Sequence, residues 1–177
     1  MIKKLFLLLA FILPLSCMQK ENTGWKQQFD RALPLLGHRN WILVVDKAFP
    51  AQTAPGMEVI NTDEDMGPVL RHVLDAIDSS THVRPIIYRD KEWSYITEDQ
   101  VKGMDVLKAE TQAILKDKEI QTILHDSVFT KLDEASRLFK VLVLKTNAAI
   151  PYSSVFLQLD CAYWNPAQEK ALRERMK

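Results

Sequence analysis

The chain has 177 residues, with 23 lysines and arginines against 23 aspartates and glutamates, so its formal net charge is zero. This balance excludes the basic surface typical of nucleic-acid-binding proteins and favours a neutral ligand over a polyanion. Without a short N-terminal targeting segment, about 160 residues remain, which is the size of one domain with one core.

The first 17 residues have the pattern of an export signal. Two lysines precede an apolar run over residues 5–15, which is too short for a permanent membrane-spanning helix. Ser16 stands directly before Cys17. This predicts a bacterial lipoprotein signal peptide over residues 1–17, cleaved before Cys17 and lipidated on it. Plain secretion and an uncleaved anchor are the alternatives.

The rest of the chain would then be held outside the cytoplasm. Residues 18–24 are expected to form a polar tether, and residues 25–177 a single domain with a C-terminal helical extension. The lipid on Cys17 would be the protein's contact with the membrane, in the bacterial periplasm or at the outer membrane. A lipidated Cys17 leaves Cys161 without a disulfide partner, and a bridge between them is the alternative for a secreted protein.

Apolar periodicity predicts strands and helices that alternate along the chain. Helices are expected at residues 25–36, after capping residues at 61–65, and at residues 98–116, 127–137 and 165–177. Strands are expected at residues 41–46, 57–60, 83–88, 120–124, 138–144 and 153–159, with a polar and aromatic loop at residues 89–97. This alternation predicts a three-layer α/β/α fold whose central sheet is mixed but mostly parallel and covered on both faces.

The strand at residues 41–46 is apolar except for its last residue, and it is bracketed by two groups that can exchange or hold protons. His38 precedes it and Asp46 ends it. A histidine before a strand is often a turn residue, and an aspartate after one is often a cap, so both structural and chemical interpretations stay open. Eight extended steps would separate them by roughly 26 Å, too far for both to contact one small molecule. Either residues 37–40 fold back, or two chains share the site.

Several familiar kinds of site are missing from the sequence. The five glycines are too widely spaced for a phosphate-binding loop. The four histidines form no helical metal-binding pair, and the mature domain has one cysteine. No Gly-x-Ser-x-Gly motif marks a serine hydrolase. We therefore expect no cofactor and no metal, but a site built from histidine, carboxylate and aromatic side chains.

Residues 37–52, GHRNWILVVDKAFPAQ, resemble the start of the D-ribose pyranase and L-fucose mutarotase (RbsD/FucU) family, especially its fucose branch. The family pattern is Gly-His, six or seven strand residues, Asp, then Ala-x-x-Pro or a close variant. Residues 146–158, TNAAIPYSSVFLQ, resemble the family's Thr-Gly-Glu-x-x-x-Tyr-x-Asn-x-x-Leu segment, with Tyr152 on the tyrosine. Ser154 replaces the asparagine of this segment, and Asn147 replaces its turn glycine. The shorter Ser154 predicts a different sugar or a weaker hold on it.

The resemblance implies an RbsD-like fold and the cofactor-independent interconversion of ring forms of a free monosaccharide, fucose-like or ribose-like. This reaction passes through the open-chain aldehyde, so one group must take the anomeric hydroxyl proton while another protonates the ring oxygen. His38 is the implied proton donor, because an imidazole can give and recover a proton near neutral pH. The implied sugar-binding residues are Asp46, His125, Tyr152, Ser153 and Ser154.

The resemblance also implies a ring-like homo-oligomer with sites between neighbouring copies. A non-catalytic sugar-binding lipoprotein that assists uptake is the alternative to an enzyme. A purely structural, ring-forming subunit is a third possibility.

Overall fold

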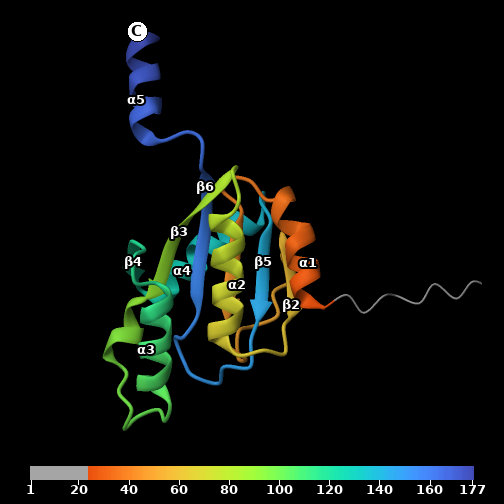
Figure 1. The fold of residues 1–177 in the computed structure, drawn as a ribbon, viewed down its shortest axis with the longest axis vertical. Coiled ribbons are helices and arrows are strands. Elements are labelled where there is room, and N and C mark those ends of the chain that lie inside the picture. Colours follow the sequence, from red (N-terminus) through yellow and green to blue (C-terminus); the bar gives the residue numbers. More distant parts are fainter. Residues whose placement is uncertain (1–23) are drawn as a thin grey trace, which may run out of the picture.

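The computed structural model describes residues 24–177. The predicted signal peptide, the lipidation site Cys17 and all of the tether except Gly24 lie outside the described residues. The elements, labelled in Figure 1, are α1 (Trp25–Ala32), η1 (Leu33–Leu35), β1 (Trp41–Val45), β2 (Met57–Asn61), α2 (Met66–Asp78), β3 (Val83–Asp90), η2 (Lys91–Tyr95), α3 (Met104–Ile114), β4 (Ile120–Ile123), α4 (His125–Ser136), β5 (Val141–Lys145), β6 (Val155–Cys161) and α5 (Pro166–Arg175).

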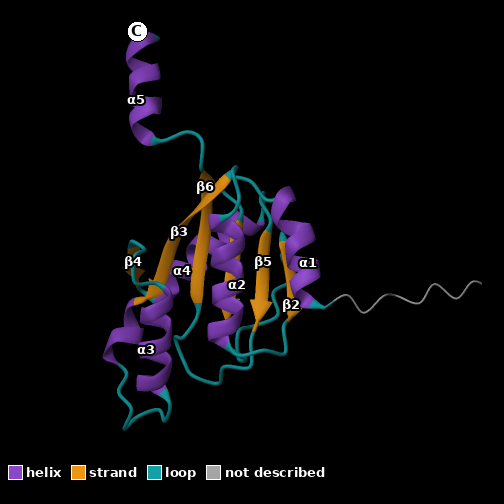
Figure 2. Cartoon of the chain, in the orientation of Figure 1, coloured by secondary structure: helices purple, strands orange, loops and turns teal. Residues whose placement is uncertain are grey.

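The six strands form one mixed sheet in the order β2-β5-β1-β6-β3-β4. β1 and β2 run parallel to β5, and β3 runs parallel to β4. β6 is antiparallel to both of its neighbours, β1 and β3, so it joins the two parallel groups. Helices cover both faces of the sheet (Figure 2). The predicted three-layer α/β/α class with a mixed sheet is confirmed.

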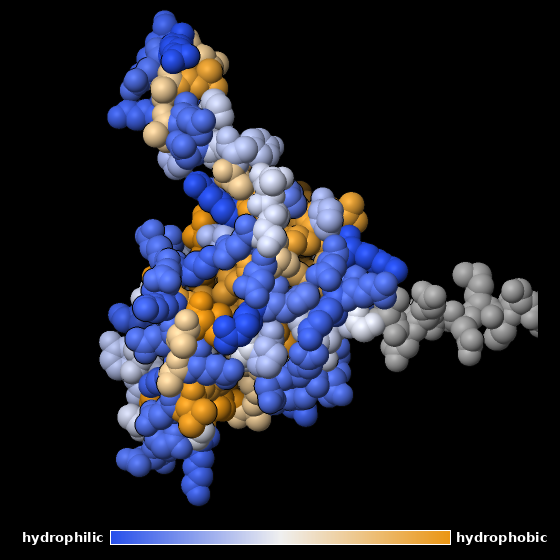
Figure 3. Space-filling model, in the orientation of Figure 1, coloured by the Kyte–Doolittle hydropathy of each residue, from blue (hydrophilic) through white to orange (hydrophobic). Residues whose placement is uncertain are grey.

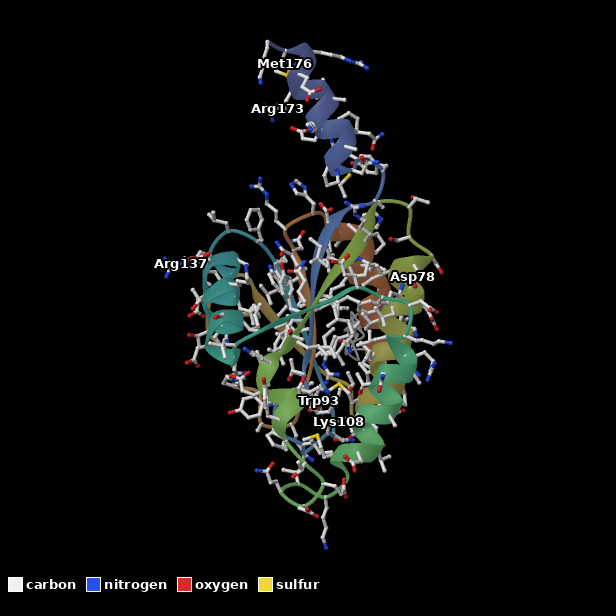
Figure 4. The ribbon with its side chains drawn as sticks, turned by 90° about the vertical axis from the view of Figure 1, so that its left-hand side faces the viewer. Asp78, Trp93, Lys108, Arg137, Arg173 and Met176 are labelled. Atoms are coloured by element: carbon white, nitrogen blue, oxygen red, sulfur yellow. The ribbon has the colours of Figure 1, made fainter. Side chains whose placement is uncertain are left out.

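The alternation of side chains along β1 shows how the two apolar layers are divided. Ile42 and Val44 belong to the core that α1, α2 and α3 cover, whereas Leu43 and Val45 belong to the core that α4 covers. All five residues of β1 are buried, as expected for a central strand between two helical layers. Figure 4 views the sheet from its edge, with Arg137 at the end of α4 on one side and Asp78 at the end of α2 on the other.

Two segments differ from the sequence prediction. The stretch predicted to be a loop from residue 89 continues β3 through Asp90, because β4 pairs with it from Ile87 onward, and it then forms the 3₁₀ helix η2. The long helix predicted from residue 98 begins only at Met104. Gly103 has a left-handed φ of 87°, which breaks the helical pattern, and the carboxylate of Glu98 accepts hydrogen bonds from the backbone N–H groups beyond it.

The C-terminal helix α5 projects from the body of the molecule (Figures 1 and 3). None of its residues is buried. Its stability is local: Asn165 and Gln168 form a capping box, and Arg173 pairs with Glu169 one turn earlier. Among residues 24–177, none of the helices combines the length and the apolar character needed to cross a membrane.

We expect a chain that ends after Asn165 to keep its free energy of unfolding within about 0.5 kcal/mol of the full-length value, because α5 buries no side chain. Urea denaturation of the two purified proteins measures this difference. A loss of more than about 1 kcal/mol would contradict the prediction and would mean that α5 packs against a surface in solution.

Candidate functional site

One end of the sheet gathers most of the polar side chains that the sequence singled out, with His38 as the exception. The parallel strands β1 and β3 end there. Asp46 directly follows β1, and Asp90 is the last residue of β3. β4 also ends there and leads into α4, whose first residue is His125. β6 runs the opposite way, so Tyr152 and Ser154, which precede it, reach the same edge. Side chains from four separate segments therefore meet at one end of the sheet.

Asp46 is held in place by its own loop and by Ser154. Its Oδ1 accepts a hydrogen bond from the Ala48 N–H at 2.8 Å, and its Oδ2 accepts one from the Ser154 hydroxyl at 2.9 Å. The Ser154 Oγ in turn accepts the Asp46 N–H at 3.2 Å. Asp46 is thus a loop cap as well as a candidate ligand group. A carboxylate has about four acceptor positions, so its two oxygens can still accept hydrogen bonds from a ligand's hydroxyls.

The hydroxyls of the two predicted serines are used inside the chain. Ser154 is 2% exposed and bonds to Asp46, while Ser153 is fully buried and donates to the Ile150 carbonyl at 2.7 Å. Their geometry suits holding the turn and the carboxylate in position. Beside Asp46 lies a cavity of about 410 Å³, lined by the loop after β1 and by residues 149–151.

Tyr152 and His125 come together at this edge. The two rings are 5.1 Å apart between centroids and meet edge to face at 82°. Tyr152 has a φ of 55°, which is uncommon for a residue with a bulky side chain and points to a strained turn. The left-handed backbone at Tyr152 therefore belongs to the turn that brings its ring against the imidazole.

Behind His125 lies a buried carboxylate that the sequence analysis missed. The Nδ1 of His125 is 3.1 Å from the Oδ2 of Asp90, in the geometry of an ion pair rather than of an aligned hydrogen bond. Asp90 is 1% exposed, and this burial raises its pKa to about 6, although His125 opposes the shift. The carboxylate of Glu92 accepts the backbone N–H of His125. The histidine is therefore fixed at both its backbone and its ring.

Aromatic side chains pack against His125 on the side of α4. Phe129 lies one turn after His125, with the two ring centroids 4.8 Å apart, and it also stacks on Phe49. Phe49 follows Asp46 in the loop after β1. Tyr152 thus contacts His125 directly, whereas the loop that carries Asp46 is linked to His125 through Phe129.

His38 does not lie in this cluster. The Asn40 N–H donates to the Gly37 carbonyl in a tight turn, and the Arg39 N–H donates to the Leu159 carbonyl. These bonds keep His38 at the opposite end of β1, where it lines a cavity of about 630 Å³ together with Asp160 and the segment leading to α5. Residues 37–40 therefore do not fold back toward Asp46. Within one chain, the implied proton donor and the other predicted site residues are apart.

Asp90 lies at the end of a strand whose last two residues the sequence pattern does not predict. An aspartate at the end of an apolar strand was recognised at position 46, and the same pattern recurs at position 90. The predicted strand nevertheless ends at residue 88, because residues 89–97 are polar and aromatic and predict a loop. In the described part of the chain, Cys161 is a free thiol, and no three histidine, cysteine or acidic side chains approach closely enough to hold a metal ion.

Comparison with solved structures finds the same fold in several sugar-related proteins. RbsD from Bacillus subtilis, complexed with D-ribose, superposes with a TM-score of 0.51 at 16% identity, over 78% of this chain and 95% of that one. FucU from Bifidobacterium longum gives a TM-score of 0.52 at 14% identity, over 75% and 92%. The fucose mutarotase from Streptococcus pneumoniae, in complex with L-fucose, gives 0.51 at 12% identity, over 72% and 87%.

The sequence also matches a known protein family. The model of the RbsD / FucU transport protein family matches residues 20–161, which leaves α5 outside the match. None of the curated proteins matches this chain. RbsD and FucU structures give equally good superpositions, so they do not separate the two branches.

Proposed function

Because the chain belongs to the RbsD / FucU transport protein family, we propose that it interconverts the ring forms of a free monosaccharide without a cofactor. The family and the structural neighbours support a sugar mutarotase or pyranase, or a sugar-binding protein, and two of those neighbours hold D-ribose and L-fucose. The observation that carries the proposal is the cluster of Asp46, His125 and Tyr152 at one edge of the sheet, with Asp90 behind the imidazole.

In this mechanism the Nε2 of His125 takes the proton of the anomeric hydroxyl, while its Nδ1–H faces the carboxylate of Asp90. A second acid protonates the ring oxygen as the bond between C1 and that oxygen breaks, which gives the open-chain aldehyde. Rotation about the C1–C2 bond, closure on the other face and return of both protons complete the exchange. Asp46, held by Ser154, and the hydroxyl of Tyr152 bind the sugar hydroxyls.

We assign the second acid to His38 of a neighbouring copy. His38 lies at the far end of β1, so it can share a sugar with Asp46 only if another chain supplies it. The assembly would be a ring-like homo-oligomer, in which each copy presents His38 on one side and the Asp46 cluster on the other. The preferred sugar is fucose-like or ribose-like. The protein itself would be exported and anchored by a lipid on Cys17.

Saturation-transfer NMR on the anomeric protons of fucose, ribose and galactose tests the reaction. We expect the protein to accelerate exchange for at least one sugar by more than tenfold over buffer, and we expect His38→Ala and Asp46→Asn each to lower that rate by at least tenfold. Equal mixtures of these two variants, refolded together, should regain activity, because roughly a quarter of the shared sites in a closed ring would be intact. No acceleration for any sugar would contradict the function.

A sugar-binding lipoprotein without catalysis is the second candidate. The distance of His38 from the cluster and the engagement of both serine hydroxyls favour it. Calorimetric binding of a sugar without faster exchange would select this function. A structural subunit would show neither binding nor exchange.

A further inference from the structure

Arg89 is a buried cation on the face of the sheet opposite to Asp90. Side chains alternate along β3, so Arg89 shares the face of Ile87, which packs in the core under α2 and α3, whereas Asp90 faces α4 with Tyr88. Arg89 is 6% exposed. Its guanidinium carbon lies 4.1 Å from the centre of the Trp93 ring, which is stacking distance. The guanidinium therefore has an aromatic partner, but no salt bridge to a carboxylate is found for it among residues 24–177.

The hydrogen-bonding capacity of Arg89 is largely unused. Its Nε and Nη2 atoms have no hydrogen-bond partner among residues 24–177. Leaving a buried cation without hydrogen bonds is unfavourable, and structures generally pair such groups. Burial lowers the pKa of Arg89 to about 10, and the charge of Asp90 across the sheet offsets this only in part. The side chain still carries its charge at neutral pH, so it retains two donor nitrogens for an acceptor that the described part of the chain does not supply.

A cavity of about 290 Å³ is lined in part by Arg89 and Trp93. Lys108, Gln112 and Ser94 also line it, and none of the lining residues within residues 24–177 is acidic. The ammonium group of Lys108 donates to the Ile96 carbonyl and lies 5.8 Å from the centre of the Trp93 ring. Figure 4 shows Trp93 and Lys108 near each other, far from Arg137 on the other side of the sheet. Two cations and two neutral hydrogen-bonding side chains thus border one small space.

We propose that this cavity is a binding site for a small oxyanion, a phosphate or carboxylate group, held by the fork of Arg89 and by Lys108. The guanidinium presents parallel N–H donors that match two oxygens of such a group, and the indole of Trp93 keeps it in the required plane. Ser94 and Gln112 can donate to the remaining oxygens. The site lies on the opposite face of the sheet from His125, so it takes a second ligand and not the sugar of the proposed reaction.

Thermal unfolding with added phosphate, acetate or chloride at constant ionic strength tests the site. We expect phosphate or acetate, but not chloride, to raise the unfolding midpoint of the wild type saturably, and the stronger of the two identifies the preferred oxyanion. In chloride buffer without phosphate or acetate, Arg89→Met should have an unfolding midpoint equal to or higher than that of the wild type, because an unpaired cation is removed. Phosphate or acetate should no longer raise the midpoint of this variant. Arg137→Met, which removes an exposed arginine on the far face, should respond like the wild type.

A second measurement covers the case in which Arg89→Met does not fold. In ¹H–¹⁵N spectra, the Nε–H signal of Arg89 should shift on titration with the preferred oxyanion, and Lys108→Met should weaken that titration about tenfold. The proposal is overturned if neither phosphate nor acetate shifts this signal, or if Arg89→Met keeps the full anion response. Neither readout depends on sugar exchange, so this result is separate from that of the proposed reaction.

Discussion

Replacing Asp90 by asparagine should lower the rate of sugar ring exchange by about 100-fold at pH 7, in line with the usual contribution of a positioned acid–base group. The carboxylate lies 3.1 Å from the Nδ1 of His125 and is almost completely buried. It orients the imidazole, and the amide of Asn keeps the shape without the charge. Saturation-transfer NMR gives the rate, and calorimetry gives the sugar affinity, which should change less than fivefold because Asp90 does not contact the ligand.

His125 and Asp90 should also act as a unit. His125→Ala is expected to lose at least as much rate as Asp90→Asn, and the double variant should lose little more than His125→Ala alone. Glu92→Gln is the matched control, because Glu92 binds the backbone N–H of His125 and not its ring, so its rate should fall less than tenfold. If Asp90→Asn kept at least half of the wild-type rate, His125 would not depend on this carboxylate.

The second large effect is on the pH dependence of stability. Between pH 4 and pH 7 the wild type should lose about 2 kcal/mol of stability relative to Asp90→Asn, at about 1.4 kcal/mol per pKa unit. The pKa of Asp90 is near 6 in the folded state and 3.8 in an unstructured chain, because burial disfavours the charged form. Only well below pH 3.8 is the carboxyl protonated in both states. As pH rises toward 6 the unfolded chain ionises first, which favours unfolding.

Urea denaturation of both proteins at pH 4, 5, 6 and 7 measures this difference. Glu98→Gln is a control of opposite sign, because backbone N–H groups of Asp105 and Gly103 hold the pKa of Glu98 below its usual value. Its contribution to stability is present above its unfolded pKa and is lost as the pH falls. A constant difference between the wild type and Asp90→Asn would show that Asp90 ionises as freely in the folded protein as in the unfolded chain.

The sequence predicts best where the cause is local. The uninterrupted apolar run of β1 requires cover on both faces, and the structure buries all of it. The two motifs of the family resemblance place Asp46 and Ser154 in direct contact. The antiparallel direction of β6 could also have been read from the chain, because nine residues separate it from β5 (residues 146–154) and a parallel crossover needs about a dozen or more.

Residues that the sequence does not single out acquire their surroundings only when the chain folds. Arg89 and Asp90 resemble loop residues until Trp93 and His125 are brought to opposite sides of them. For His38, the spacing along β1 leaves two possibilities open, a fold-back of residues 37–40 or a site shared by two chains, and the structure shows that residues 37–40 do not fold back.

The opposite charges of Arg89 and Asp90, buried on opposite faces of one strand, also protect the fold against mispairing. If β3 slid by one residue against β6, every side chain would change face, and the guanidinium would meet His125 while the carboxylate met Trp93. Each charge would then be buried without its favourable neighbour, a penalty of several kcal/mol. A wholly apolar strand has no such safeguard, whereas a one-residue slip of β3 would place both charges beside the wrong side chains.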